Sequence, residues 1–127
     1  MARILLAEDE EALRALTARA LTDSGHEVVT AVDGAEALDI AMREQGAFDL
    51  LLTDIKMPLM DGIALALSVA RDHPTIIILL MTAYADQRER ASNLDALIHD
   101  VILKPFTLAE IKSAVNDALA ARKQRAG

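Results

Sequence analysis

The sequence contains no cysteine and no tryptophan, and its aromatic residues are limited to one tyrosine and two phenylalanines. Without cysteine, the chain forms no disulfide bond, no thiolate metal site and no cysteine nucleophile. This absence is compatible with the cytoplasm, where we expect the protein to act. The core must be built from aliphatic side chains, and a hydrophobic content of 53% over 127 residues is sufficient for one sizeable core.

Long hydrophobic runs and an excess of basic residues are also missing. No stretch of about 18 consecutive apolar residues is present, so we expect no membrane-spanning helix. The 13 Lys and Arg residues are outnumbered by 20 Asp and Glu residues, which gives a net charge of −7 at pH 7. Direct binding to nucleic acid is therefore disfavoured, whereas cations and basic partner surfaces are favoured.

The chain alternates between strand patterns and helix patterns. The strand patterns are short, mostly apolar segments at residues 3–7, 27–31, 48–53 and 75–81, with a fifth strand within residues 97–103. The helix patterns occupy residues 10–24, 35–45, 63–72, 86–94 and 107–122. Such alternation predicts an α/β fold: a doubly wound, five-stranded parallel sheet of order 2-1-3-4-5, with helices on both faces, as in flavodoxin-like (βα)5 proteins. We expect one domain over residues 1–122 and a C-terminal tail at residues 123–127.

Polar side chains follow four of the five predicted strands. Glu8 and Asp9 come after the first strand, Asp54 after the third, Thr82 after the fourth and Lys104 after the fifth. In a sheet of this order, the first and third strands are neighbours at the topological switch point, where sites form. The three carboxylates are therefore expected to converge.

These residue types suit phosphoryl transfer. Three carboxylates that share one small mouth repel each other and stay ionised only beside a cation, and oxygen ligands favour Mg²⁺. Lys104 offers a point charge for phosphate, and Thr82 offers a hydroxyl donor. A carboxylate nucleophile beside a divalent metal, a lysine and a hydroxyl is an arrangement for accepting a phosphoryl group, here on Asp54.

Each of these residues also has an ordinary explanation when it is considered alone. The acidic residues 8–10 could form the first turn of a helix, where the helix dipole favours them. Asp54 could be a turn residue, Thr82 a helix cap and Lys104 a solvated charge. Their joint placement at successive strand ends is what favours a functional site.

Four segments of the chain resemble the receiver domain of two-component response regulators, the chemotaxis-regulator fold. They are ILLAEDE, DLLLTDIKMPLMDG, LLMTAYAD and ILKPF, and together they extend the resemblance over nearly the whole chain. The resemblance implies that Asp54 is the phosphoacceptor. It also implies an acidic Mg²⁺ pocket, in which Asp9 binds directly, Glu8 acts through water and the backbone carbonyl of Lys56 is a further ligand.

The resemblance further implies that Thr82 is the switch hydroxyl and that Lys104 binds the phosphoryl group. Many receivers have Tyr or Phe three residues before the lysine, where this chain has Val101. An aromatic rotor therefore cannot report phosphorylation, and we expect the segment at residues 82–94 to respond instead. The MARILLAED start, the LLLTDI core and the valine also resemble CpdR-type stand-alone regulators, which control delivery of substrates to a protease.

The implied function is that of a signalling switch and not of an enzyme. The implied phosphodonor is a sensor histidine kinase or a histidine phosphotransferase. Output is expected through contact with a downstream protein, which could be protease-related. A phosphate relay or sink without output, and a degenerate receiver that only docks, remain open alternatives.

Two other classes of protein fit the sequence poorly. A haloacid-dehalogenase-type phosphatase would need an Asp-x-Asp motif after the first strand and a cap insertion, but this chain has Glu8-Asp9-Glu10 and no room for a cap. A flavodoxin-like nucleotide binder would need a phosphate loop rich in Gly, Ser or Thr, whereas the loop after the first strand is acidic and would repel phosphate.

Overall fold

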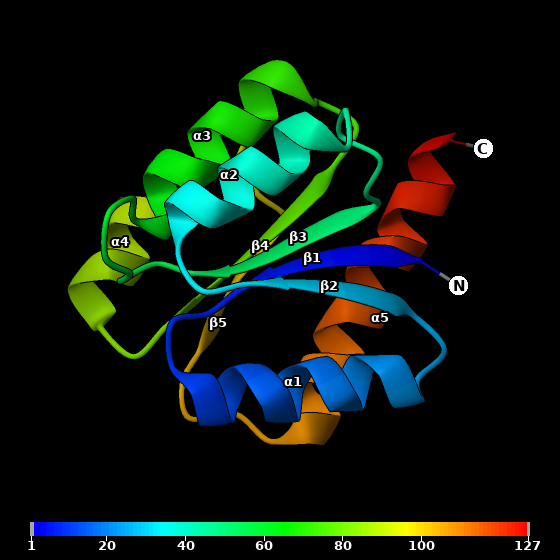
Figure 1. Cartoon of the computed structure of the whole chain (residues 1–127), viewed down its shortest axis with the longest axis horizontal. Coiled ribbons are helices and arrows are strands. Elements are labelled where there is room, and N and C mark those ends of the chain that lie inside the picture. Colours follow the sequence, from blue (N-terminus) through cyan, green and yellow to red (C-terminus); the bar gives the residue numbers. More distant parts are fainter. Residues whose placement is uncertain (1, 127) are drawn as a thin grey trace.

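Five strands and five helices alternate along the chain in the computed structural model, which describes residues 2–126 (Figure 1). The strands are β1 (Arg3–Ala7), β2 (Glu27–Ala31), β3 (Leu50–Asp54), β4 (Ile77–Thr82) and β5 (Asp100–Leu103). The helices are α1 (Glu11–Asp23), α2 (Gly34–Arg43), α3 (Gly62–Asp72), α4 (Ala85–Ser92) and α5 (Leu108–Ala126).

All strands pair in parallel, and the sheet has the order β2-β1-β3-β4-β5. The predicted fold class and strand order are confirmed. Helices α1 and α5 cover one face of the sheet, and α2, α3 and α4 cover the other (Figure 1). The carboxyl ends of all five strands therefore lie along one edge, which is where polar residues from distant parts of the sequence can meet.

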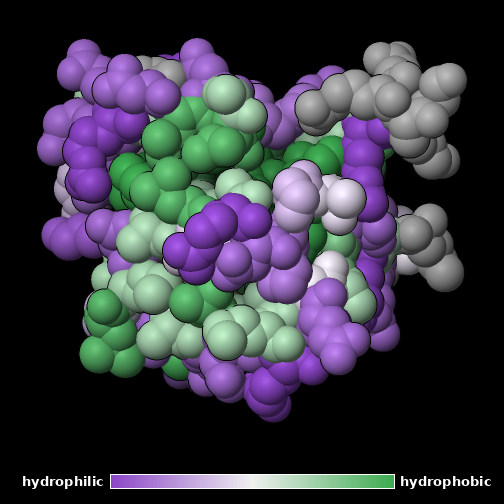
Figure 2. Space-filling view, turned by 90° about the horizontal axis from the view of Figure 1, so that it is seen from above, coloured by the Kyte–Doolittle hydropathy of each residue, from purple (hydrophilic) through white to green (hydrophobic). Residues whose placement is uncertain are grey.

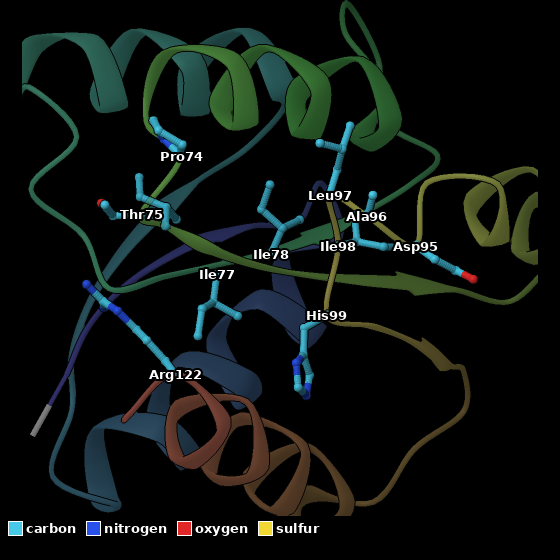
Figure 3. A pocket seen from close by; sticks show the side chains of 11 residues that line it. Pro74, Thr75, Ile77, Ile78, Asp95, Ala96, Leu97, Ile98, His99 and Arg122 are labelled. Atoms are coloured by element: carbon cyan, nitrogen blue, oxygen red, sulfur yellow. The ribbon is translucent and has the colours of Figure 1, made fainter. Parts of the chain in front are cut away.

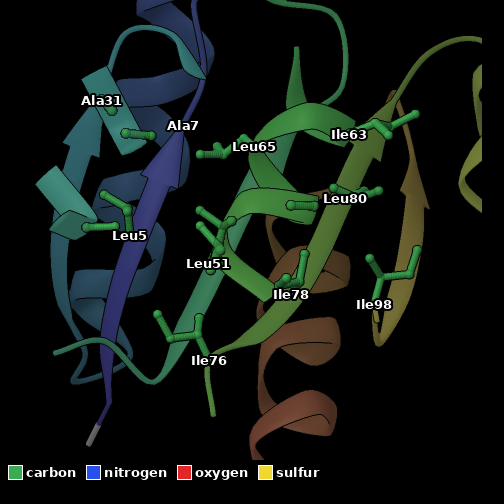
Figure 4. Packing of buried hydrophobic residues seen from close by; sticks show 14 of the residues in the cluster. Leu5, Ala7, Ala31, Leu51, Ile63, Leu65, Ile76, Ile78, Leu80 and Ile98 are labelled. Atoms are coloured by element: carbon green, nitrogen blue, oxygen red, sulfur yellow. The ribbon is translucent and has the colours of Figure 1, made fainter. Parts of the chain in front are cut away.

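The two faces of the sheet are buried in two separate hydrophobic clusters. On one face, Leu5, Leu51 and Ile78 pack with residues of α2 and α3 (Figure 4). On the other face, their neighbours in sequence pack against α1 and α5, as Leu50 does. Because successive side chains of a strand point to opposite faces, a continuous apolar run is the pattern of a strand that is covered on both sides.

The surface of the α2–α3 side has hydrophobic areas interrupted by hydrophilic side chains (Figure 2). The exposed apolar side chains of these two helices include Met42 and Leu67. Scattered exposure of this kind is normal for a folded chain and does not by itself indicate an interface.

Five strand boundaries differ from the sequence prediction: β3 and β4 each begin two residues later than predicted, both also end later, and β5 begins later. β3 and β4 each extend one residue further than predicted, so that Asp54 and Thr82 are the last residues of their strands. β5 begins only at Asp100, although the apolar pattern begins at Leu97. The amides of Leu97 and Ile98 both donate to the carbonyl of Leu94, which holds this segment in a turn after α4 and removes it from the sheet.

Helices α2, α3 and α5 begin with side-chain caps. The Asp33 carboxylate accepts a hydrogen bond from the Glu36 amide at 2.7 Å and caps α2, and Asp61 caps α3 in the same way. Thr107 and Glu110 form a reciprocal capping box before α5. The helix α5 continues to Ala126, beyond its predicted end at residue 122, so the predicted tail is helical up to that residue; Gly127 lies outside the described residues.

No helix within residues 2–126 combines the length and the apolar character needed to cross a membrane.

Thr17 of α1 is a polar residue that is buried in the core. Its side chain is 1% exposed, and its hydroxyl oxygen has no hydrogen-bond partner. A buried hydroxyl without a partner keeps its desolvation cost uncompensated. Replacing Thr17 with Val, which has the same shape, is therefore expected to raise the free energy of unfolding by about 1 kcal/mol in urea denaturation. Thr22→Val, at an exposed position of the same helix, is the control and should give no such gain; equal effects at both positions would contradict this explanation.

Candidate functional site

Three carboxylates meet at the carboxyl edge of the sheet. Glu8 and Asp9 directly follow β1, and Asp54 ends β3, which pairs with β1. One oxygen atom from each of the three residues lies within 4.8 Å of the others. Glu8 is 1% exposed and Asp54 is 7% exposed, whereas Asp9 lies open to solvent. The structure thus brings together the acidic residues that the sequence predicts to converge.

Lys104 enters the same site from the far side of β4. Its ammonium nitrogen lies 2.6 Å from Glu8 Oε1 and 3.1 Å from Asp54 Oδ2. Its backbone amide donates to the carbonyl oxygen of Thr82 at 2.8 Å, which fixes the start of the side chain beside the end of β4. Lys104 therefore bridges the two most buried carboxylates of the site.

The electrostatics of the site reflect this crowding. Partial burial raises the pKa of the Asp9 carboxyl, and the neighbouring carboxylate of Glu8 raises that pKa further. Burial alone would lower the pKa of Lys104, but the hydrogen bond to Glu8 and the charges of Asp54 and Glu8 outweigh it, so the pKa is raised. The ammonium form of Lys104 is thus strongly favoured.

The donor set fits a divalent cation. Three ionised carboxylates with one lysine leave a net charge of −2 at this mouth, which a single divalent ion balances. All available ligand atoms are oxygens, which Mg²⁺ prefers, and the exposed position of Asp9 leaves room for water ligands. The acidic triad is consistent with a Mg²⁺ site.

Thr82 lies at the end of β4, and its hydroxyl forms hydrogen bonds with residues that follow it in the chain. The hydroxyl is 1% exposed, donates to Gln87 Oε1 at 2.8 Å and accepts from the Tyr84 amide at 3.1 Å. Tyr84 belongs to the loop from β4 to α4, and Gln87 belongs to α4. The structure therefore places Thr82 beside the site, next to the backbone of Lys104, but with its hydroxyl bonded to its own loop.

The loop between β3 and α3 carries Lys56, two residues after Asp54. The Lys56 ammonium lies over the Tyr84 ring, 5.1 Å from the ring centre, in a cation–π contact. The amide of Ile55 donates to Met81 at 2.9 Å, and Gly62 packs on the backbone of Asp54. A Cβ atom at Gly62 would lie 2.0 Å from the Asp54 carbonyl oxygen, so only glycine permits this close approach.

Two residues near the site carry no signal in the sequence. Gln87 contacts Thr82, but a glutamine in a polar helix has no pattern that distinguishes it from a solvated surface residue. Arg14 of α1 donates to the carbonyl oxygen of Glu8 at 2.9 Å, six residues away, and so helps fix the first acidic loop. Both contacts depend on side-chain conformations that spacing alone does not reveal.

A separate groove lies at the opposite end of the sheet (Figure 3). It has a volume of about 610 Å³ and lies against the amino-terminal part of β4, residues 76–78, and the turn at residues 95–99. Its two basic side chains are paired: Arg122 bonds to Asp49 at 2.7 Å and His99 to Asp117 at 3.3 Å. Because its two basic side chains are paired and no cluster of possible metal ligands lies there among the described residues, this groove is not the candidate site.

Comparison with known proteins gives consistent matches. The family model "Response regulator receiver domain" matches residues 4–116. The transcriptional regulatory protein TcrA of Mycobacterium tuberculosis is 37% identical over 109 residues, which make up 86% of this chain and 42% of TcrA. The chain thus spans less than half the length of that relative.

Solved structures match over almost the whole chain. A response regulator receiver domain protein from Clostridium thermocellum has 25% identity and a TM-score of 0.87, and the match covers 98% of both chains. The response regulator TrrA from Thermotoga maritima, solved in complex with Mg²⁺-BeF, has 32% identity and a TM-score of 0.83; the match covers 93% of this chain and 99% of TrrA.

Proposed function

Because the chain belongs to the response regulator receiver domain family, whose members are signalling switches rather than enzymes, we propose that it accepts a phosphoryl group on Asp54. The proposed donor is the phosphohistidine of a sensor histidine kinase or of a histidine phosphotransferase. The observation that carries the proposal is the pairing of Asp54 with Lys104 inside a triad of carboxylates. The proposed setting is the cytoplasm, in keeping with the absence of cysteine.

In the proposed reaction, a carboxylate oxygen of Asp54 forms a bond to phosphorus while the phosphorus–nitrogen bond of the donor breaks. The imidazole leaves with that electron pair and takes up a proton. Asp54 suits the role of nucleophile because it is 7% exposed, so little water competes for its oxygen or for the resulting acyl phosphate. Lys104 holds its orientation through the 3.1 Å contact.

The residues that would hold Mg²⁺ are Asp9, Asp54 and the backbone carbonyl of Lys56, with Glu8 acting through water. A bound Mg²⁺ would supply positive charge against the oxygens of the transferred group. TrrA, which has a similar fold, was solved with Mg²⁺-BeF. Glu8 suits an indirect role because its Oε1 atom already accepts from Lys104 at 2.6 Å.

Output is proposed to pass through the loop that follows β4. Val101 is half-buried and pairs with Leu80, and a valine is too short and too stiff about χ1 to act as a rotating reporter. The segment from Thr82 into α4 is therefore the part proposed to change when phosphorylation occurs. Its proposed target is a downstream protein; the resemblance to CpdR-type regulators makes a protease-related protein the first to test, and a phosphate relay or sink is the alternative.

Mass spectrometry tests the proposed function. Incubating the protein with Mg²⁺ and acetyl phosphate, a small acyl-phosphate donor, is expected to increase the intact mass by roughly 80 Da, the mass of one phosphoryl group. Removing Mg²⁺ with a chelator should prevent the increase. A degenerate receiver that only docks would show no adduct under either condition, and that result would overturn the proposal.

The two acidic residues of the first loop should contribute unequally to metal binding. Asp9→Ala is expected to weaken Mg²⁺ binding at least tenfold in a calorimetric titration, because a direct ligand is lost. Glu8→Ala should weaken it less, because Glu8 acts through water. Equal affinities in the two variants would contradict this assignment. Asp9→Ala relieves repulsion between carboxylates without breaking an ion pair of Lys104, so this change should not lower the melting temperature of the metal-free protein.

A further inference from the structure

The Thr82 hydroxyl has both of its hydrogen-bonding functions engaged in this structure. Its one proton goes to Gln87 Oε1 at 2.8 Å, and its oxygen accepts the Tyr84 amide at 3.1 Å. A hydroxyl has only one proton to donate. While Gln87 holds that proton, Thr82 cannot donate to a group on Asp54.

The rest of the loop is held in the same place by a second contact. The Tyr84 ring lies under the Lys56 ammonium at 5.1 Å, and this links the loop after β4 to the loop after β3. Gln87 lies in the short helix α4 and is half-buried, whereas its neighbours Asp86 and Arg88 are exposed. Its amide is thus fixed by the fold close to Thr82, five residues earlier in the chain.

We propose that Gln87 is a positioning residue that latches the Thr82 hydroxyl away from Asp54 in the unphosphorylated protein; this inference rests on the proposed function. Phosphorylation supplies anionic oxygens, and a hydrogen bond to an ionised acceptor is about twice as strong as one to a neutral amide. The Thr82 hydroxyl therefore breaks its hydrogen bond to Gln87 and donates to the phosphoryl group instead. The exchange frees α4 from the end of β4, and this is the structural change that a partner reads.

The latch predicts that breaking the contact favours the activated state. Beryllofluoride with Mg²⁺ mimics the acyl phosphate and serves as the probe, with affinity measured by NMR titration. Gln87→Met keeps the length and helix propensity of the side chain but removes the strong acceptor. Because a typical hydrogen bond no longer has to be broken, beryllofluoride is expected to bind roughly threefold to tenfold more tightly.

Gln87→Glu tests the direction of the hydrogen bond. A carboxylate can only accept, so it keeps the contact with the Thr82 hydroxyl and strengthens it. Beryllofluoride should then bind more weakly than to the wild type. If the Gln87 amide nitrogen were the donor instead, Gln87 would not hold the Thr82 proton, so Gln87→Met would not tighten beryllofluoride binding, and the proposed latch would be wrong.

Thr82→Val is the background that separates the latch from general effects of charge or helix stability. With no hydroxyl to hold, Gln87→Met should leave the beryllofluoride affinity of the Thr82→Val protein unchanged. Gln87→Glu should lower that affinity only by the amount that its added negative charge causes. Asn93→Met, which removes an exposed amide at the end of α4, is the matched control and should leave the wild-type affinity unchanged.

The outcomes distinguish this inference from the proposed function. If the wild-type protein binds no beryllofluoride and takes up no phosphoryl group, the proposed function fails. If the wild type binds but Gln87→Met has wild-type affinity, or tightens binding equally with and without the Thr82 hydroxyl, the latch is overturned while the proposed function stands.

Discussion

Replacing Asp54 with Asn is expected to reduce Mg²⁺-dependent phosphorylation by acetyl phosphate by at least about a thousandfold, measured as the rate of the mass increase. The amide has the shape of the carboxylate but lacks its nucleophilic oxygen. The fold should remain intact, because Asp54 contributes its side chain to the site and its backbone to β3. Circular dichroism and the melting temperature check that the variant is folded.

Asp61→Asn is the matched control for this change. Asp61 lies seven residues away and caps α3 by accepting from the Ala64 amide at 2.8 Å. Asparagine caps a helix about as well as aspartate, so neither stability nor phosphorylation should change appreciably. If the Asp54→Asn protein gains mass as fast as the wild type, Asp54 is not the acceptor.

Lys104→Met is expected to destabilise the metal-free protein by about 3 kcal/mol or more. The change leaves Glu8, which is 1% exposed, without its counter-charge, and it also removes the contact with Asp54. The loss should appear in urea denaturation in the presence of a chelator. Lys112→Met, a similar change on α5, should alter the free energy of unfolding by no more than about 0.5 kcal/mol.

The same variant should separate metal binding from switching. Lys104 contacts the carboxylates and is proposed to meet the phosphoryl oxygens, but it does not bind the cation. Removing its positive charge should preserve or increase the affinity for Mg²⁺, and added Mg²⁺ should recover part of the lost stability. The rate of phosphorylation and the affinity for beryllofluoride should both fall strongly. A variant that loses Mg²⁺ affinity and nothing else would place the lysine in a different role.

The strands and their order were predictable because burial on both faces leaves a simple pattern. β3 and β4 are buried along their whole length, and each begins in the sequence with an uninterrupted apolar run, at residues 50–52 and 77–81. The start of β5 was not predictable in this way. Leu97 and Ile98 are as apolar as strand residues, but their amides donate to the carbonyl oxygen of Leu94. Whether these hydrogen bonds form depends on how α4 ends, which the apolar pattern does not reveal.

The composition of the site was predictable for the same reason, and its internal contacts were not. Residues at the carboxyl ends of parallel strands must share one edge, so Glu8, Asp9 and Asp54 could be grouped from their positions alone. The sequence interpretation assigned Lys104 to phosphate only. The ion pair of Lys104 with Glu8 depends on side-chain conformation, as does the contact between Thr82 and Gln87.

The most direct measurement is to locate the acyl phosphate in the chain. The protein is incubated with acetyl phosphate and Mg²⁺ and then reduced with borohydride, which converts an aspartyl phosphate to homoserine but leaves free carboxylates unchanged. Peptide mass spectrometry then identifies the residue. The account predicts homoserine at position 54 and at no other aspartate, and only when Mg²⁺ is present. Homoserine at Asp9 or elsewhere, or its absence from every peptide, would contradict it.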